Sequence, residues 1–222
     1  MVVANEHVYI GFTGQVYLSG MPEPSNLDAA FAAIDAANAA GPRTFKMADA
    51  VQPYELVCGR RMTAALNVYD PDAAPPLQLA ARAQHLERWV IPRADYPMNR
   101  VGYLKWRNDQ KTRHAARAAE ILAPLGYSAE TLDRVKFLLQ KKRLKKDADT
   151  QTLEDVICLV FLEHHALEFA GDHPEEKVVD ILRKTWGKMS EKGQGSALLL
   201  DLDPAVRGLV KKALADGWIS GQ

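Results

Sequence analysis

The stretch QTLEDVICLVFLE, Gln151–Glu163, decides the fold class of this 222-residue chain. Every position from 156 to 162 is apolar, which is typical of a buried helix or a buried strand. The helical patterns on both sides favour a helix. Its first turns carry two adjacent carboxylates, Glu154 and Asp155. Because carboxylates that enter a core must be paired, hydrogen-bonded or bound to a cation, this helix is where the sequence first indicates chemistry.

The flanking segments predict a helical protein, because apolar residues recur at helical spacing and Gly or Pro separates the segments. Helices are expected over 27–40, 54–69, 77–90, 103–125, 128–142, 151–163, 177–189 and 205–217, with an irregular segment over 91–102. Residues 1–24 are rich in Gly and β-formers and predict a short hairpin or an irregular arm. The sequence therefore predicts an all-α helical bundle that forms one domain over 25–222, preceded by this arm.

The charge balance limits the classes of partner. Lys and Arg number 28, as do Asp and Glu, which argues against nucleic acid as the main partner. The longest apolar run is far short of the roughly 20 residues that cross a bilayer, and no signal peptide is evident. Cys58 and Cys158 lie in apolar helical patterns and are expected to be buried, reduced thiols. We therefore expect a cytoplasmic protein without a membrane partner. Whether it forms a homo-oligomer stays open.

Two histidines lie on apolar faces of the expected helices. His85 shares its face with Ala81 and Trp89, and His114 lies on the side of its helix that carries Trp106. A histidine in such a place is either a satisfied core residue or a ligand, and both alternatives remain at this point. Asp155 is the more buried of the two adjacent acids, whereas Glu154 could instead be an acid that stabilises the helix N-terminus.

The segment IPRADYPMNRVGYLKWR, 91–107, places arginines beside aromatic residues. Such a combination suits an anionic or planar ligand through forked hydrogen bonds and stacking. The alternative is a structural loop whose arginines cap helix ends. The run KKRLKK, 141–146, is either a solvated face or a phosphate or nucleic-acid contact.

Five segments together resemble an uncharacterised family known as domain of unknown function 4202. They are AARAQHLERW (80–89), IPRADYP (91–97), GYLKWR (102–107), QTLEDVICLVFLE (151–163) and KTWGKMS (184–190). The resemblance extends over about residues 27–215, nearly everything after the arm. It implies no activity, because the family has none firmly assigned.

The helix order is also similar to HD-type metal phosphohydrolases, which arrange histidines and aspartates around one or two cations. This resemblance implies that the helical bundle is HD-like and that His85 and Asp155 are metal ligands. His114 or Glu87 would complete the site as catalytic residues. The resemblance also implies a divalent cation, Fe, Mn, Zn or Ni, that would activate a bound water. The substrate would be held by Arg61, Arg93, Lys141 and Trp106.

The pattern also departs from HD-type enzymes. Leu86 stands where the aspartate of the His-Asp pair belongs, and Arg60 and Arg61 stand where the first histidine belongs. Losing two ligands would weaken the binding of a hard cation, and the arginines could hold an anion instead.

Two functions therefore follow from the sequence. The first is a divergent, HD-like, metal-dependent hydrolase that acts on a small phosphorylated or anionic substrate, and we slightly favour it. It expects Asp155→Asn to abolish metal binding without unfolding the protein. The alternative is a catalytically inactive helical module that binds an anionic ligand or a protein partner.

Overall fold

The computed structural model describes residues 8–10, 16–18, 27–46 and 50–215 and confirms an all-α domain. The helices are α1 (Leu27–Ala39), α2 (Tyr54–Tyr69), α3 (Pro75–Arg82), α4 (Arg100–Leu122), α5 (Ala129–Leu139), α6 (Ala148–His164), α7 (Ala166–Gly171), α8 (Glu175–Trp186), α9 (Glu191–Leu198) and α10 (Pro204–Ala215). Short 3-10 turns are η1 (Arg88–Val90), η2 (Arg93–Asp95) and η3 (Ala123–Leu125). In the N-terminal arm, strands β1 (Val8–Ile10) and β2 (Val16–Leu18) pair antiparallel, and the rest of the arm lies outside the described residues.

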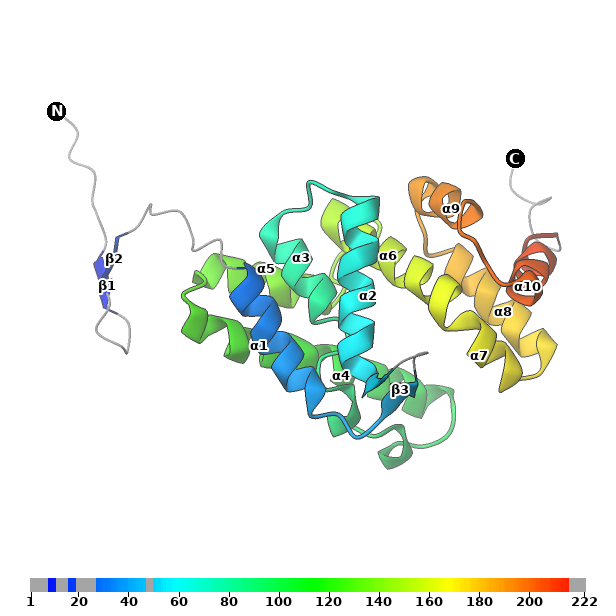
Figure 1. Cartoon of the computed structure of the whole chain (residues 1–222), viewed down its shortest axis with the longest axis horizontal. Coiled ribbons are helices and arrows are strands. Elements are labelled where there is room, and N and C mark those ends of the chain that lie inside the picture. The colour runs from blue at the N-terminus through cyan, green and yellow to red at the C-terminus, as the bar shows by residue number, and fades with distance from the viewer. Residues whose placement is uncertain (1–7, 11–15, 19–26, 47–49, 216–222) are drawn as a thin grey trace.

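Helix α6 lies in the middle of the bundle (Figure 1). Helices α1 to α5 gather around one end of it, and α7 to α10 lie at the other. It packs against α2, α3, α5, α7 and α9. Its apolar run is largely buried, so the expected buried helix is confirmed. None of the helices in the described ranges combines the length and the hydropathy that crossing a membrane requires.

The helix expected over 77–90 ends early, at Arg82. Glu87 adopts a left-handed backbone with φ 48°, which a helix cannot continue through. The side chain of Asn38, from α1, accepts a 2.9 Å hydrogen bond from the Glu87 N–H. His85 and Trp89 lie beyond the end of α3 and do not share a helix face, so that prediction is wrong. The Asn38–Glu87 hydrogen bond and the left-handed backbone of Glu87 belong to the turn that replaces the second half of the expected helix.

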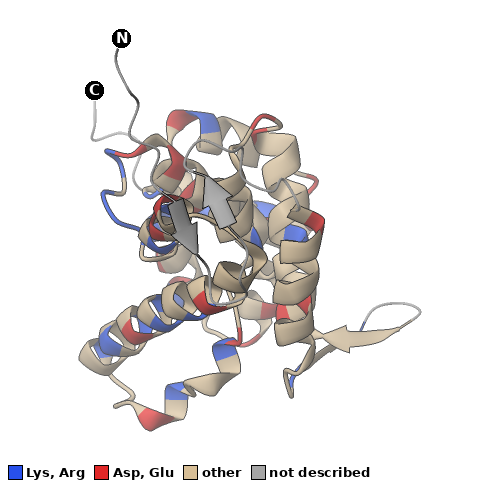
Figure 2. Ribbon diagram, turned by 90° about the vertical axis from the view of Figure 1, so that its left-hand side faces the viewer, with Lys and Arg blue, Asp and Glu red and all other residues tan. Residues whose placement is uncertain are grey.

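The sequence also missed a hairpin, formed by β3 (Thr44–Lys46) and β4 (Val51–Pro53), which pair antiparallel. Strands of three residues are too short to show an alternating pattern. The hairpin projects from the helices, as Figure 2 shows. Helices α7 and α9 were likewise not predicted, and they join the core around α6 and α8.

Burying α2 against its neighbours should contribute strongly to stability. Leu66 of α2 has no exposed surface. Truncating it should therefore remove apolar contacts and leave a cavity, so we expect Leu66→Ala to lower the free energy of unfolding by about 2–5 kcal/mol. Urea denaturation measures this change. Leu199→Ala is the control, because Leu199 is 88% exposed, and equal losses in the two variants would contradict the described core.

Candidate functional site

The two adjacent carboxylates of α6 are both buried, and Glu154 is the one that meets cations. Lys141 Nζ donates to Glu154 Oε2 at 2.5 Å, and Lys188 Nζ lies 3.9 Å from Oε1. The Lys141 side chain is only 11% exposed and the Glu154 side chain 4%. Since an isolated buried charge is very costly, the lysine and the carboxylate must enter the interior together.

The segment after α5 has an unusual backbone that turns Lys141 inward. Lys141, Arg143 and Lys145 all have positive φ, between 55° and 69°, which costs a residue with a side chain roughly 1–2 kcal/mol. Lys142 and Arg143 are exposed, whereas Lys145 Nζ donates to the Gly187 carbonyl at 3.0 Å. The basic run 141–146, seen as a loop rich in Lys and Arg in Figure 2, is therefore not a uniform solvated face.

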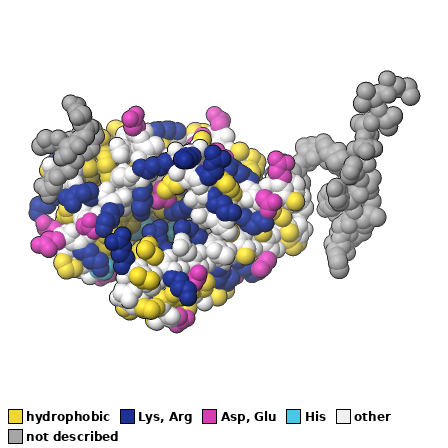
Figure 3. Space-filling view, turned by 180° about the vertical axis from the view of Figure 1, so that it is seen from behind, with side chains coloured by type: hydrophobic (Ala, Val, Ile, Leu, Met, Phe, Trp, Pro, Cys, Tyr) yellow, Lys and Arg dark blue, Asp and Glu magenta, His cyan; other side chains and the backbone are white. Residues whose placement is uncertain are grey.

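Two further cations from α4 join this pair. Arg107 and Lys111 are one helical turn apart, and both act electrostatically on Lys141 and Glu154. We call Arg107, Lys111, Lys141 and Lys188 the cationic cluster. Neither Arg107 nor Lys111 forms an ion pair within the described ranges. Figure 3 shows Lys and Arg side chains gathered across one face of the molecule, with histidine side chains visible between them.

The pKa shifts in the cationic cluster come first from burial and then from the neighbouring charges. Burial works to raise the pKa of Glu154, but Lys141 and Lys188 outweigh it and lower that pKa, so the carboxylate is ionised at neutral pH. Burial lowers the pKa of Lys141, and Glu154 opposes that shift. The pKa of Lys111 is also lowered, first by burial and then by Arg107 and Lys141. One carboxylate thus faces several cations.

Three histidines nearby are kept neutral by the same environment. Burial and then Arg88 lower the pKa of His85 well below its usual value and that of His114 to about 4. Burial and then Arg61 lower the pKa of His165 to about 4. His85 is half-buried, and Lys141 is among the charges that act on it. Its Nδ1 is buried without a hydrogen-bond partner among the described residues.

Arginines and aromatic rings from the start of α2 and from the β3 end of the hairpin lie near His165. Arg43 lies 3.4 Å from the centroid of the Tyr54 ring, and Arg61 lies 4.4 Å from that of Phe45. Tyr54 Oη is 3.2 Å from His165 Nδ1. Cys58 Sγ is 3.9 Å from His165 Nε2, but burial raises the pKa of Cys58 to about 11. The cysteine is thus a thiol, and not a nucleophile activated by this histidine.

Asp155 points into a different environment from that of His85. Its Oδ1 accepts hydrogen bonds from Gln151 Nε2 at 2.9 Å and from the Ser190 N–H at 2.8 Å. Its Oδ2 accepts from the hydroxyls of Tyr69 at 2.8 Å and Ser190 at 2.5 Å. Gln151 Nε2 also donates to the Lys188 carbonyl at 2.9 Å. Asp155 therefore ties α6 to α2 and to the start of α9, next to Lys188.

Other predicted site residues have structural partners. Glu87 forms ion pairs with Arg113 at 2.7 Å and Arg117 at 3.1 Å. Arg93 donates to the carbonyls of Tyr96 and Pro97, and Trp106 Nε1 donates to the Ile91 carbonyl at 2.8 Å. The Leu86 carbonyl lies 2.7 Å from His114 Nδ1, within hydrogen-bonding distance. Arg93 and Trp106 therefore fit the alternative of a structural loop.

His114, His165 and Lys141 are thus among the groups that act electrostatically on His85, and Arg61 acts in the same way on His165. The structure does not bring Asp155 to His85. In the described part of the chain, no three His, Cys, Asp or Glu side chains are grouped as metal ligands would be.

Sequence reasoning missed Lys111, Lys188 and Arg88. Nothing in the local pattern distinguishes them from surface cations, because their partners come from other segments. Arg88 is the clearest case: its guanidinium lies 4.6 Å from the Trp106 ring centroid, and burial lowers its pKa, with Arg107 and Arg43 adding to the shift. The signal that could have found Lys188 is Glu154, since a buried carboxylate requires a cation.

Comparison with known proteins gives a family but no activity. The model of a family described as "Domain of unknown function (DUF4202)" matches residues 28–210. No curated protein and no solved structure matches the chain significantly. The geometry of the site is therefore the basis for its interpretation.

Replacing Asp155 should destabilise the fold, because every group around it is a donor. In Asp155→Asn the amide nitrogen cannot accept the hydrogen bonds that a carboxylate oxygen accepts, so we expect a loss of about 1–3 kcal/mol. Asp155→Ala should lose more, since it also leaves a cavity. Thermal and urea unfolding measure both. Asp155→Asn with wild-type stability would show that this network does not hold α6 to α9.

Proposed function

The chain belongs to the DUF4202 family, whose description assigns no activity, and we propose from its site that it binds a small molecule bearing phosphate groups at the cationic cluster. The observation that carries the proposal is the gathering of Arg107, Lys111 and Lys188 around the buried Lys141–Glu154 pair. This function corresponds to the alternative expected from the sequence, a helical module for an anionic ligand.

The charges of the cationic cluster support an anionic ligand. Glu154 accepts one hydrogen bond from Lys141, but Lys188 stays 3.9 Å from it, beyond hydrogen-bonding distance. The donors of Lys188, Arg107 and Lys111 can therefore turn toward a ligand. Glu154 neutralises only part of the positive charge, and a bound anion would neutralise the rest.

The residue types favour phosphate within the class of anions. A guanidinium offers a planar fork that matches two phosphate oxygens, and an ammonium adds a point charge. The cationic cluster combines the one fork of Arg107 with three lysines. Partial burial strengthens these interactions, because water screens them less than at an open surface.

Hydrolysis of the bound phosphate ester is a second candidate, and His85 favours it. Its imidazole is neutral, partly reaches the surface, and lies where the charge of Lys141 acts on it. A neutral imidazole can take the proton of an attacking water, and the cationic cluster could stabilise the negative charge that develops. This activity needs no residue beyond those already gathered.

The divalent cation implied by the HD-type resemblance stays a prediction. The residues that the structure describes do not fit it well, because both oxygens of Asp155 already accept hydrogen bonds from four donors. His85 has cations rather than carboxylates among the charges that act on it.

Removing single cations should weaken phosphate binding. We expect Lys188→Met and Arg107→Met each to weaken the binding of inorganic pyrophosphate by about 10–100-fold, since a hydrogen bond to a charged group contributes about 1.5–3 kcal/mol. Isothermal titration calorimetry at low salt measures the affinity, and added salt should weaken binding to the wild type.

Lys142→Met is the matched control for these variants, because Lys142 is the exposed neighbour of Lys141 and is not among the charges that act on Lys141, Glu154 or Lys111. It should retain the wild-type affinity. No binding of pyrophosphate to the wild type, or an equal loss in the control, would contradict the proposal.

The hydrolytic candidate has its own test in His85→Asn. If His85 accepts the proton of water, this variant should hydrolyse para-nitrophenyl phosphate at least about 100-fold more slowly than the wild type, while its pyrophosphate affinity stays unchanged. Unchanged turnover, or no turnover by the wild type, would leave a binding function without hydrolysis.

A further inference from the structure

Exposed apolar side chains gather where α4 begins. Val90, Met98, Val101 and Leu104 are all exposed, Met98 at 81% and Val101 at 76%. We call these four residues the apolar projection. Arg100 and Lys105 are exposed beside it, so its rim is basic. Hydrophobic side chains lie among Lys and Arg side chains on the face shown in Figure 3. A contiguous apolar surface with a charged rim is typical of a docking site.

The apolar projection is held rigidly by its own backbone contacts. The Arg93 guanidinium donates to the carbonyls of Tyr96 and Pro97 at 2.9 and 2.8 Å. The side chain of Asn99 caps α4 by accepting from the Gly102 N–H. A Cβ at Gly102 would lie 2.1 Å from the Pro97 carbonyl oxygen, so only glycine allows this close approach. A preorganised surface loses little conformational entropy when it binds.

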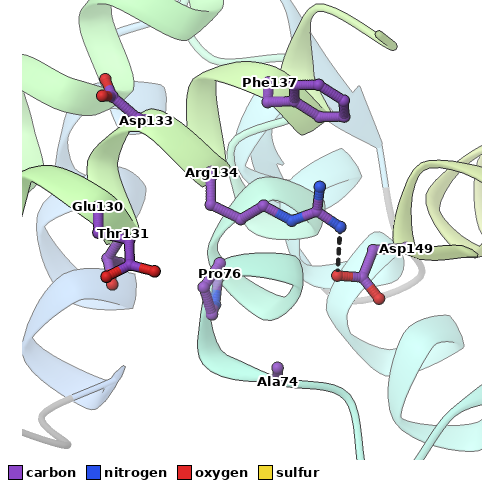
Figure 4. Close-up of a pocket in the computed structure, with 8 residues that line it drawn as sticks. All are labelled: Ala74, Pro76, Glu130, Thr131, Asp133, Arg134, Phe137 and Asp149. Atoms are coloured by element: carbon purple, nitrogen blue, oxygen red, sulfur yellow. Dashed lines mark hydrogen bonds and ion pairs between the residues drawn. The ribbon is translucent and has the colours of Figure 1, made fainter. Parts of the chain in front are cut away.

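An acidic hollow lies beside the first turns of α5. Its volume is about 580 Å³, and its lining residues are Ala74, Pro76, Glu130, Thr131, Asp133, Arg134, Phe137 and Asp149. Figure 4 shows Arg134 reaching across to Asp149, with Glu130 and Asp133 on the other side of the arginine. Arg134 pairs with both Asp147 and Asp149, and Lys136 pairs with the exposed Asp133, so Glu130 is the lining carboxylate without an ion pair in the described part of the chain. The hollow thus offers apolar walls and a negative rim.

These two surfaces lie at opposite ends of α4. The apolar projection surrounds its first turn, whereas the hollow adjoins α5, which follows the last turn of α4 through η3. A helix of 23 residues is about 34 Å long, so one chain cannot bring its own projection to its own hollow. A second copy of the chain can.

We propose that the apolar projection of one chain docks into the acidic hollow of a second copy. Met98, Val101 and Leu104 would enter the hollow against Pro76 and Phe137, and Arg100 and Lys105 would face Glu130 and Asp133. The contact joins two different surfaces, so it is heterologous and leaves one of each surface free on the resulting dimer. Further copies of the chain can bind to these free surfaces in the same head-to-tail arrangement.

Sedimentation velocity of the full chain tests this contact. The average mass should rise with protein concentration at low salt, and less so at high salt, because the rims are charged. Leu104→Glu should make the chain monomeric by placing a carboxylate in the apolar contact. Asp133→Lys should do the same by placing a cation opposite the basic rim. Leu199→Glu, at an exposed apolar position elsewhere, should associate as the wild type does.

Mixing the two monomeric variants gives the decisive result. Leu104→Glu retains an intact hollow and Asp133→Lys retains an intact projection, so the mixture should form dimers that do not grow further. A wild type that stays monomeric at every concentration, or a mixture that stays monomeric, would overturn the proposal. Binding of the monomeric wild type to vesicles of phosphatidylglycerol, lost in Leu104→Glu, would overturn it by assigning the projection to a lipid surface.

Discussion

Two adjacent buried carboxylates on α6 are the constraint on which the rest of this structure depends. Glu154 and Asp155 point about 100° apart, so one partner cannot satisfy both. Asp155 takes hydroxyl, amide and backbone donors from Tyr69, Gln151 and Ser190. Glu154 forms an ion pair with Lys141 and a longer-range one with Lys188. Around this one helical turn the chain therefore assembles α2, α9 and the loops after α5 and α8.

The candidate site follows from the way these two requirements are met. Lys141 pairs with Glu154 from a backbone that adopts positive φ, and local strain of this kind is often kept where it has a function. The hydrogen bonds of Asp155 and Gln151 fix the turn that carries Lys188. Arg107 adds charge that no carboxylate in the described residues balances. The cations that stabilise the buried Glu154 carboxylate therefore outnumber it, and the cationic cluster carries net positive charge.

Much of the fold could be predicted because local patterns decide it. The helix predicted over 54–69 has the same bounds as α2, and the apolar run of α6 predicted the central helix. Long-range contacts decide the rest. Asn38 binds the backbone of the turn that follows α3, where the helix was expected to continue, and the β3–β4 strands are too short to show a period. For the candidate site, the sequence predicted His85, Arg61 and Lys141, and these stay predictions, whereas Lys111 and Lys188 become recognisable only beside Glu154.

The central claim is that the cationic cluster holds a phosphate-like anion. The most direct test is a crystal structure of the chain grown with tungstate, whose anomalous scattering locates the anion without reference to any model of the site. Our account predicts a peak within hydrogen-bonding distance of Lys188 and Arg107, on the exposed side of the Lys141–Glu154 pair. Tungstate bound only at other surface cations, with Lys188 and Arg107 well ordered and empty, would contradict it.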